Sequence, residues 1–174
     1  MEPELDLATA AALRAEWRAE EAEWSRAARE RWEHGRSLVD VLRDCMHRGD
    51  TVAVEVAPLT FTGTVRSVGD DLVRIETPEG SVDVRVAPDT PAVVRIVTSA
   101  RAGGGRGDAS VPTFLARLRQ LERSRVRLGL RGPHESIEGE VHVARDHVSV
   151  VDGDGRRAYV PIGSVCWVRP VDVD

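Results

Sequence analysis

The sequence contains no lysine and no asparagine, and all 24 of its basic side chains are arginine. Schiff-base catalysis requires a lysine amine, and the P-loop that binds nucleotide phosphates requires a lysine beside its glycines. Both of these enzyme classes are therefore excluded.

Cysteine is also scarce, since Cys45 and Cys166 are the only two thiols. Two cysteines are too few for a disulfide framework or for a zinc site with four cysteine ligands. His142 and His147 flank Asp146, but a turn near Asp146 would separate the two rings, and the common nucleophile and metalloprotease motifs are missing. We therefore predict no metal, no cofactor and no enzymatic activity.

Long apolar runs are missing as well. Runs such as the Ala-Ala-Ala-Leu of residues 10–13 are far shorter than the roughly 20 apolar residues that cross a bilayer. The first residues are acidic where a secretory signal is basic, so we expect a cytoplasmic protein with no membrane partner. The 29 acidic residues outnumber the arginines, and the net charge of −5 gives the chain as a whole no strong attraction for nucleic acid.

Residues 5–33 are rich in alanine, glutamate, arginine and leucine, and contain neither glycine nor proline. Within them, Leu13, Trp17, Trp24 and Trp32 recur at helical spacing and form one apolar stripe. Three of the four tryptophans of the chain lie on this stripe. The pattern predicts a long amphipathic helix within residues 1–36.

Beyond residue 49 the apolar residues alternate with polar ones, which is typical of strands. A short helix near residues 38–45 and about five strands, by pattern alone, fill the segment up to residue 97. A glycine-rich linker follows over residues 99–110, and then the order of helix and strands recurs. The alignment of this repeat pairs Val52 with Leu128, Val54 with Leu130, Gly63 with Gly139, Val73 with Val148, and Val84 with Val160.

These patterns predict a mainly β protein with an N-terminal α segment. Its segments are the amphipathic helix of residues 1–36, a first repeat over 37–98, the linker over 99–110 and a second repeat over 111–174. Each repeat is expected to be a short helix followed by a small five-stranded barrel, because closure of short curved strands removes unpaired edges. Gly63 and Gly139 mark the bend where a side chain would not fit.

The first repeat carries a short helix over residues 38–42, a V-x-V strand over 52–54, the mid-strand Gly63, and Asp71 before an apolar strand. This order resembles the Sm-like small barrels over residues 38–97 and, more loosely, over 112–169, and an SH3-like barrel is the alternative. The resemblance implies an RNA site that uses an asparagine shortly after that aspartate, and this chain has no asparagine. The family's second motif is echoed only by residues 94–96, so the fold can be shared without the RNA site.

Arginine is concentrated between residues 101 and 134, where eight arginines stand against Asp108 and Glu122. Such a segment can contact phosphates, which makes RNA or DNA a candidate partner. The alternative is a solvated surface paired with the acidic side chains of the N-terminal helix. The candidate nucleic-acid residues are Arg117, Arg119, Arg123, Arg125, Arg127 and Arg131.

The tryptophan stripe gives the leading functional hypothesis. Tryptophan is a favoured anchor of protein interfaces, so Trp17, Trp24 and Trp32 are the candidate interface residues. Packing of the same stripe on the chain's own barrels is the alternative. The sequence therefore favours a non-catalytic interaction or regulatory protein that binds a protein partner or self-associates, with RNA or DNA binding as the second hypothesis.

Overall fold

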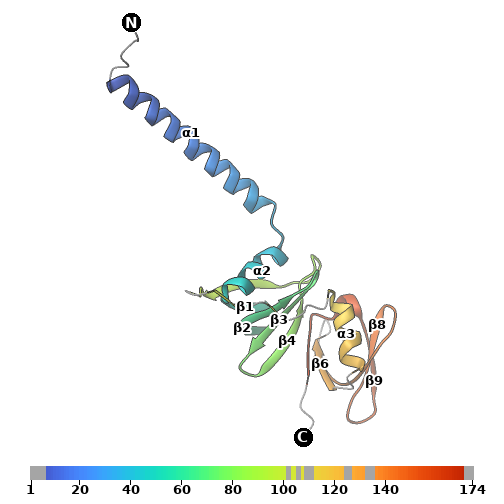
Figure 1. The fold of residues 1–174 in the computed structure, drawn as a ribbon. Coiled ribbons are helices and arrows are strands. Elements are labelled where there is room, and N and C mark those ends of the chain that lie inside the picture. The colour runs from blue at the N-terminus through green and yellow to red at the C-terminus, as the bar shows by residue number, and fades with distance from the viewer. Residues whose placement is uncertain are drawn as a thin grey trace. The chain divides into compact units, whose positions relative to one another are not determined.

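The computed structural model describes residues 7–100, 103–104, 107, 112–123, 127–131 and 136–170. The chain divides into two compact units, Met1–Ser37 and Leu38–Asp174. The first unit is built on helix α1 (Leu7–His34). The second unit holds helices α2 and α3 and the ten strands of the described chain (Figure 1).

Helix α1 confirms the long helix predicted from the composition of this segment. It ends at His34, and the N–H of the following Gly35 donates a hydrogen bond to the carbonyl oxygen of Arg31 at 3.1 Å. Apart from the half-buried Ala10, every side chain described in α1 is exposed. In the part of the chain that the structure describes, no helix is long and apolar enough to cross a membrane.

The second unit contains two repeats of one helix and five strands. The first repeat consists of α2 (Leu38–Arg48), β1 (Thr51–Val56), β2 (Leu59–Val68), β3 (Leu72–Thr77), β4 (Gly80–Arg85) and β5 (Val93–Thr98). The second repeat consists of α3 (Phe114–Arg123), β6 (Arg127–Arg131), β7 (Ser136–Val143), β8 (His147–Val151), β9 (Arg157–Pro161), the short 3-10 helix η1 (Ile162–Ser164) and β10 (Trp167–Pro170). The strands are antiparallel and lie in the order β5-β1-β2-β3-β4-β10-β6-β7-β8-β9.

The strand registers confirm the repeat alignment, because Gly63 on β2 and Gly139 on β7 occupy the same register position. A Cβ atom at Gly63 would collide with the backbone carbonyl oxygen of Glu76 on β3. A Cβ atom at Gly139 would collide in the same way with the carbonyl oxygen of Val151 on β8. Each repeat therefore requires glycine at this position of its second strand.

The expectation of two closed barrels is wrong. The strands form two open antiparallel runs, six strands in β5-β1-β2-β3-β4-β10 and three in β7-β8-β9, joined through β6. The first repeat does not close because β10 occupies the edge of β4 that β5 would need. The second repeat does not close because β10 pairs with β6 and β4, and not with β9. The fold is therefore a mixed α/β arrangement with open sheets, and it is not mainly β with two barrels.

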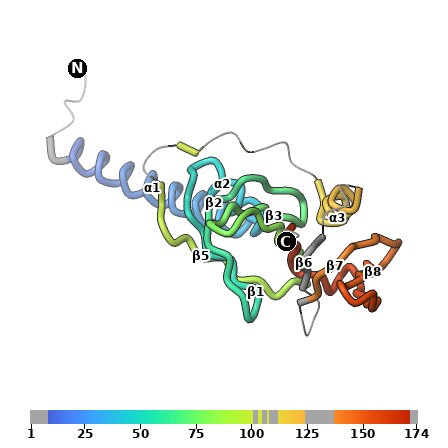
Figure 2. The backbone as a smooth tube through the Cα atoms, turned by 90° about the horizontal axis from the view of Figure 1, so that it is seen from below, coloured from blue at the N-terminus to red at the C-terminus, as the bar shows by residue number. Residues whose placement is uncertain are grey.

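Strand β10 also joins two hydrophobic cores. One core contains Leu42 of α2 with side chains of the first repeat, and the other contains Phe114 of α3 with side chains of the second. Trp167 of β10 is 3% exposed and belongs to the first core, whereas its neighbour Val168 is fully buried in the second. Successive residues of a strand face opposite sides, so β10 supplies one side chain to each core. Figure 2 follows the backbone from the first repeat, in cyan to yellow-green, to the second, in orange to red.

Candidate functional site

Helix α1 carries a row of exposed large apolar side chains, among them the two most exposed of the described residues. Trp17 and Trp24 are 73% and 77% exposed, Trp32 is 57% exposed, and Leu13 is 45% exposed. We call these four residues the Trp face, because their spacing places them along one side of the helix. The Arg36 guanidinium lies 4.1 Å from the centre of the Trp32 ring, a cation–π distance.

The Trp face carries no titratable chemistry of its own. A surface hollow along the helix is lined by Leu13, Trp17 and neighbouring charged side chains of α1. A tryptophan buries about 150–250 Å² when it is covered, so an exposed row of three has a large apolar area to contribute to a contact. This face can therefore bind an apolar surface.

The arginine segment is divided by the structure. Arg119 and Arg123 are exposed on α3, whereas the side chain of Arg117 is only 12% exposed. Arg127 and Arg131 lie at the two ends of β6, where their register partners on β7 are Glu140 and Ser136. Arg125 lies outside the described residues. Among the side chains of this segment that the structure describes, Arg119 and Arg123 are the exposed cations that a phosphate could reach.

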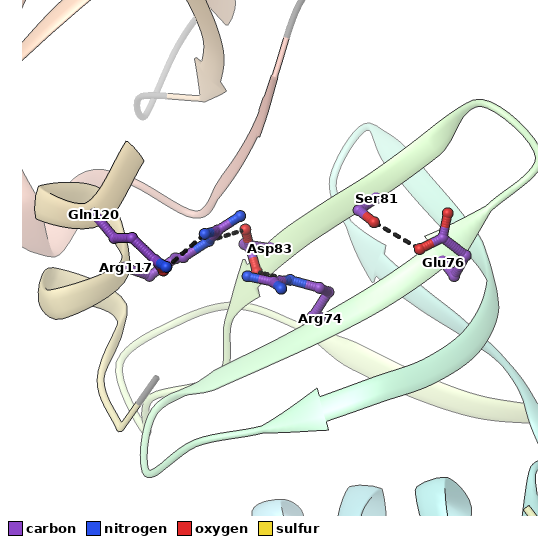
Figure 3. Close-up of polar contacts among 6 residues, drawn as sticks. All are labelled: Arg74, Glu76, Ser81, Asp83, Arg117 and Gln120. Carbon is purple, nitrogen blue, oxygen red and sulfur yellow. Dashed lines mark hydrogen bonds and ion pairs between the residues drawn. The ribbon is translucent and has the colours of Figure 1, made fainter. Parts of the chain in front are cut away.

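Arg117 is held by a carboxylate of the first repeat, an arrangement that the sequence analysis did not identify. Asp83 on β4 is 1% exposed, and one of its carboxylate oxygens accepts a hydrogen bond from Arg117 Nε at 2.7 Å (Figure 3). The other oxygen accepts from Arg74 Nε of β3 at 2.9 Å. Arg117 also donates to Gln120 Oε1 at 2.8 Å. A buried carboxylate thus has a cation on each side, as a buried charge requires.

This ionic cluster belongs to a larger contact between the repeats, which we call the internal joint. In it β4 pairs with β10, so that Trp167 lies opposite Val84 and Val168 lies opposite Asp83. The ring of Trp167 also meets the Phe61 ring edge to face, with centroids 5.4 Å apart. The internal joint therefore combines backbone pairing, an aromatic contact and a buried ionic cluster.

A second cross-repeat contact lies at the start of α3. The backbone N–H of Phe114 donates a hydrogen bond to Asp71 Oδ1 at 2.7 Å. Asp71 directly precedes β3, and its carboxylate satisfies one of the free N–H groups at a helix N-terminus. In this structure its carboxylate supports the packing of the two repeats.

A buried polar cluster closes the end of α2. Asp50 is fully buried, and its carboxylate accepts hydrogen bonds from Arg48 Nε at 2.8 Å and from the Ala100 N–H at 2.9 Å. The hydrogen bond from Arg48 holds the pKa of Asp50 below its usual range, while burial raises the pKa of the neighbouring Cys45 thiol. A thiol with a raised pKa is a weak nucleophile. The cluster fixes the chain after β5 against the end of α2.

The two histidines lie apart from this cluster, in the second repeat. His147 Nδ1 lies 2.7 Å from Asp146 Oδ1, and this hydrogen bond lowers the pKa of Asp146. His142 lies 4.0 Å from both Glu122 and Glu140. Over the described ranges, no group of three or more His, Cys, Asp or Glu side chains is placed to hold a metal ion.

Comparison of the chain with protein-family models, curated proteins and solved structures found no match. Among the described residues, the Trp face and the exposed arginines of α3 are exposed surfaces that can receive a partner.

Proposed function

We propose that this chain is a non-catalytic interaction protein that self-associates, and that the Trp face of α1 is a contact surface. The observation that carries the proposal is the exposure of Trp17 and Trp24, which are 73% and 77% accessible. Exposed apolar patches of this kind are typical of interaction sites, and tryptophan is the residue most enriched among interface hot spots.

The charge pattern of α1 supports a second molecule of the same chain as the occupant. The helix carries six glutamates and five arginines, so two such helices can approach each other with little net repulsion. Isolated helices derive little stability from propensity alone, and most helical stability in proteins comes from packing of an apolar face. Pairing of the Trp face with that of a second molecule would provide this packing.

The mass of the particle in solution tests the proposal. We expect the full chain to have a mean mass well above the 19.0 kDa of one molecule, measured by light scattering over a range of concentrations. Trp24→Ala should raise the dissociation constant of this contact at least tenfold, because truncation of a hot-spot residue typically costs about 2 kcal/mol or more.

Arg26→Ala is the matched control. Arg26 is exposed on α1 and lies nine positions from Trp17, which places it on the opposite side of the helix. Its substitution should leave the mass unchanged, and the circular dichroism of both variants should match that of the parent. An equal mass for Trp24→Ala and the parent chain at every concentration would contradict a role for the Trp face.

Nucleic-acid binding is the second candidate function, and its support is narrower. Arg119 and Arg123 are exposed and close together on α3, which is the observation in its favour. Arg117 is engaged by the buried carboxylate of Asp83, so its guanidinium serves the internal joint. The described part of the arginine segment thus offers two phosphate contacts, and such contacts are expected to be strongly salt-dependent.

A further inference from the structure

The strand order ends in β5 on one side and β9 on the other, and within the described residues each of these strands has a partner on one side only. An unpaired strand edge presents N–H and C=O groups that a strand of another molecule can pair. Strand β5 carries Val93, Ile96 and Val97 with 49%, 46% and 56% exposure. Strand β9 carries Tyr159 with 64% exposure. Each free edge therefore carries exposed apolar side chains, beside the exposed Arg95 on β5 and Arg157 on β9.

The internal joint shows how the fourth strand of one repeat pairs with the fifth strand of another. Strands β4 and β9 are the fourth strands of their repeats, and β10 and β5 are the fifth strands. In the internal joint, the fourth strand of one repeat pairs with the fifth strand of the other. The two edges that are left, β9 and β5, are again one fourth strand and one fifth strand.

The registers within each repeat identify the equivalent positions. Val84 lies opposite Val73, as Val160 lies opposite Val148, so the two fourth strands are aligned. The fifth strands are aligned by their pairing with the first strand of each repeat. The resulting equivalents are Asp83 and Tyr159, Val84 and Val160, Trp167 and Val93, and Val168 and Val94.

The positions at the two free edges are more exposed than their equivalents in the internal joint, as expected where a partner strand is missing. In the internal joint, Asp83 and Trp167 are 1% and 3% exposed. At the two free edges, their equivalents Tyr159 and Val93 are 64% and 49% exposed. Tyr159 and Val93 thus have the positions, but not the burial, of the residues that form the internal joint.

The helices that begin the two repeats, α2 and α3, differ in a matching way. Alignment of the fully buried Leu42 of α2 with the fully buried Leu118 of α3 puts Val41 at the position of Arg117. In the internal joint, Arg117 meets the carboxylate of Asp83. At a joint between β9 and β5, Tyr159 at the position of Asp83 would meet Val41 at the position of Arg117. Each helix thus carries the residue type that suits the fourth strand it would face.

We propose that β9 of one molecule pairs antiparallel with β5 of a second molecule, so that the chain assembles head to tail. In the register of the internal joint, Tyr159 lies opposite Val94 of the second molecule and Val160 lies opposite Val93. The contact joins two different surfaces and is therefore heterologous, unlike the pairing of two Trp faces. It rests on the proposed function only in that the partner is again a second molecule of this chain.

The test uses the full chain with Trp24→Ala, so that association through the Trp face contributes little. In this background the mass measured by sedimentation velocity should reach at least twice the 19.0 kDa of one molecule and rise with concentration. Adding Tyr159→Asp or Val93→Asp should raise the dissociation constant at least tenfold, because each places an unpaired carboxylate in the contact. Thr62→Asp is the matched control, since Thr62 is an exposed strand position away from both edges and should leave the mass unchanged.

A mixing experiment tests the head-to-tail geometry itself. A Tyr159→Asp molecule keeps a usable β5 edge, and a Val93→Asp molecule keeps a usable β9 edge. Each variant alone should be monomeric, whereas an equimolar mixture should form particles of two molecules and nothing larger. Variants that had merely unfolded would not complement each other in this way, and circular dichroism would show the loss of strand signal.

The outcomes separate this inference from the proposed function. A Trp24→Ala chain that is monomeric at every concentration, while the parent chain associates, overturns the β9–β5 contact and leaves the Trp face supported. Association that Tyr159→Asp and Val93→Asp do not weaken also overturns the inference. A monomeric parent chain overturns both proposals.

Discussion

Removal of the Asp83 carboxylate is the sharpest test of how the two repeats are held together. Asp83→Ala leaves the guanidinium groups of Arg74 and Arg117 without their common partner at a position that is 1% exposed. Removing one member of a buried ion pair typically costs 3–5 kcal/mol, because it leaves uncompensated buried charge. The two arginine side chains are 19% and 12% exposed and can regain some hydration. We therefore expect a loss near the lower limit, about 3 kcal/mol.

Urea denaturation followed by circular dichroism measures this loss, with every variant at one low protein concentration so that self-association does not contribute. Arg117→Ala should cost only about 1–2 kcal/mol, because Arg74 still neutralises the carboxylate of Asp83. Ser81→Ala on the same strand is the control, since it removes only an exposed hydrogen bond to Glu76 and should cost less than about 0.5 kcal/mol (Figure 3). A loss for Asp83→Ala no larger than that for Ser81→Ala would refute the importance of the ionic cluster.

Three further outcomes are expected. Gly63→Ala should destabilise the fold by about 3 kcal/mol in urea denaturation, because the new methyl group meets backbone and the neighbouring strand cannot move away cheaply; an unchanged midpoint would contradict the close approach. The lowered pKa of Asp50 means that the unfolded chain binds a proton more readily, so this residue's contribution to stability is present above about pH 4 and is lost as the pH falls below it; Asp50→Asn should flatten this acid dependence, and an unaltered profile would contradict the assignment. If α3 binds nucleic acid, Arg119→Ala combined with Arg123→Ala should weaken binding to all sequences and reduce its salt dependence in fluorescence anisotropy, and unchanged binding would exclude these two residues.

Local features of this fold could be predicted from the sequence because they depend on local patterns. The helix α1 follows from a glycine-free and proline-free segment with apolar residues at helical spacing. The repeat follows from two alternating patterns whose glycines, Gly63 and Gly139, meet the same steric requirement. Both features depend on residues that are close in sequence or on one neighbouring strand, so a pattern in one sequence is enough to predict them.

Closure of the strands could not be predicted, because it depends on which of two similar edges β10 meets. The alternation of Trp167 and Val168 fits a strand in a closed barrel as well as a strand shared between two repeats. The burial of Asp83 could not be predicted for the same reason. A charged residue between two valines is typical of a strand whose polar face is in water, and this carboxylate is buried where α3 and β10 meet β4. Long-range contacts of this kind leave little trace in a local pattern.

Differences between the two repeats carry information that their similarity does not. At the position where the first repeat has the buried Asp83, the second has the exposed Tyr159, and where α3 has Arg117, α2 has Val41. Both positions therefore differ together: Asp83 and Arg117 form an ion pair inside the chain, whereas their equivalents Tyr159 and Val41 are both apolar. A single change could reflect only a tolerant surface position. A matched pair of changes on opposite edges is expected if those edges meet, because an arginine or an aspartate facing an apolar partner would be buried without a counter-charge.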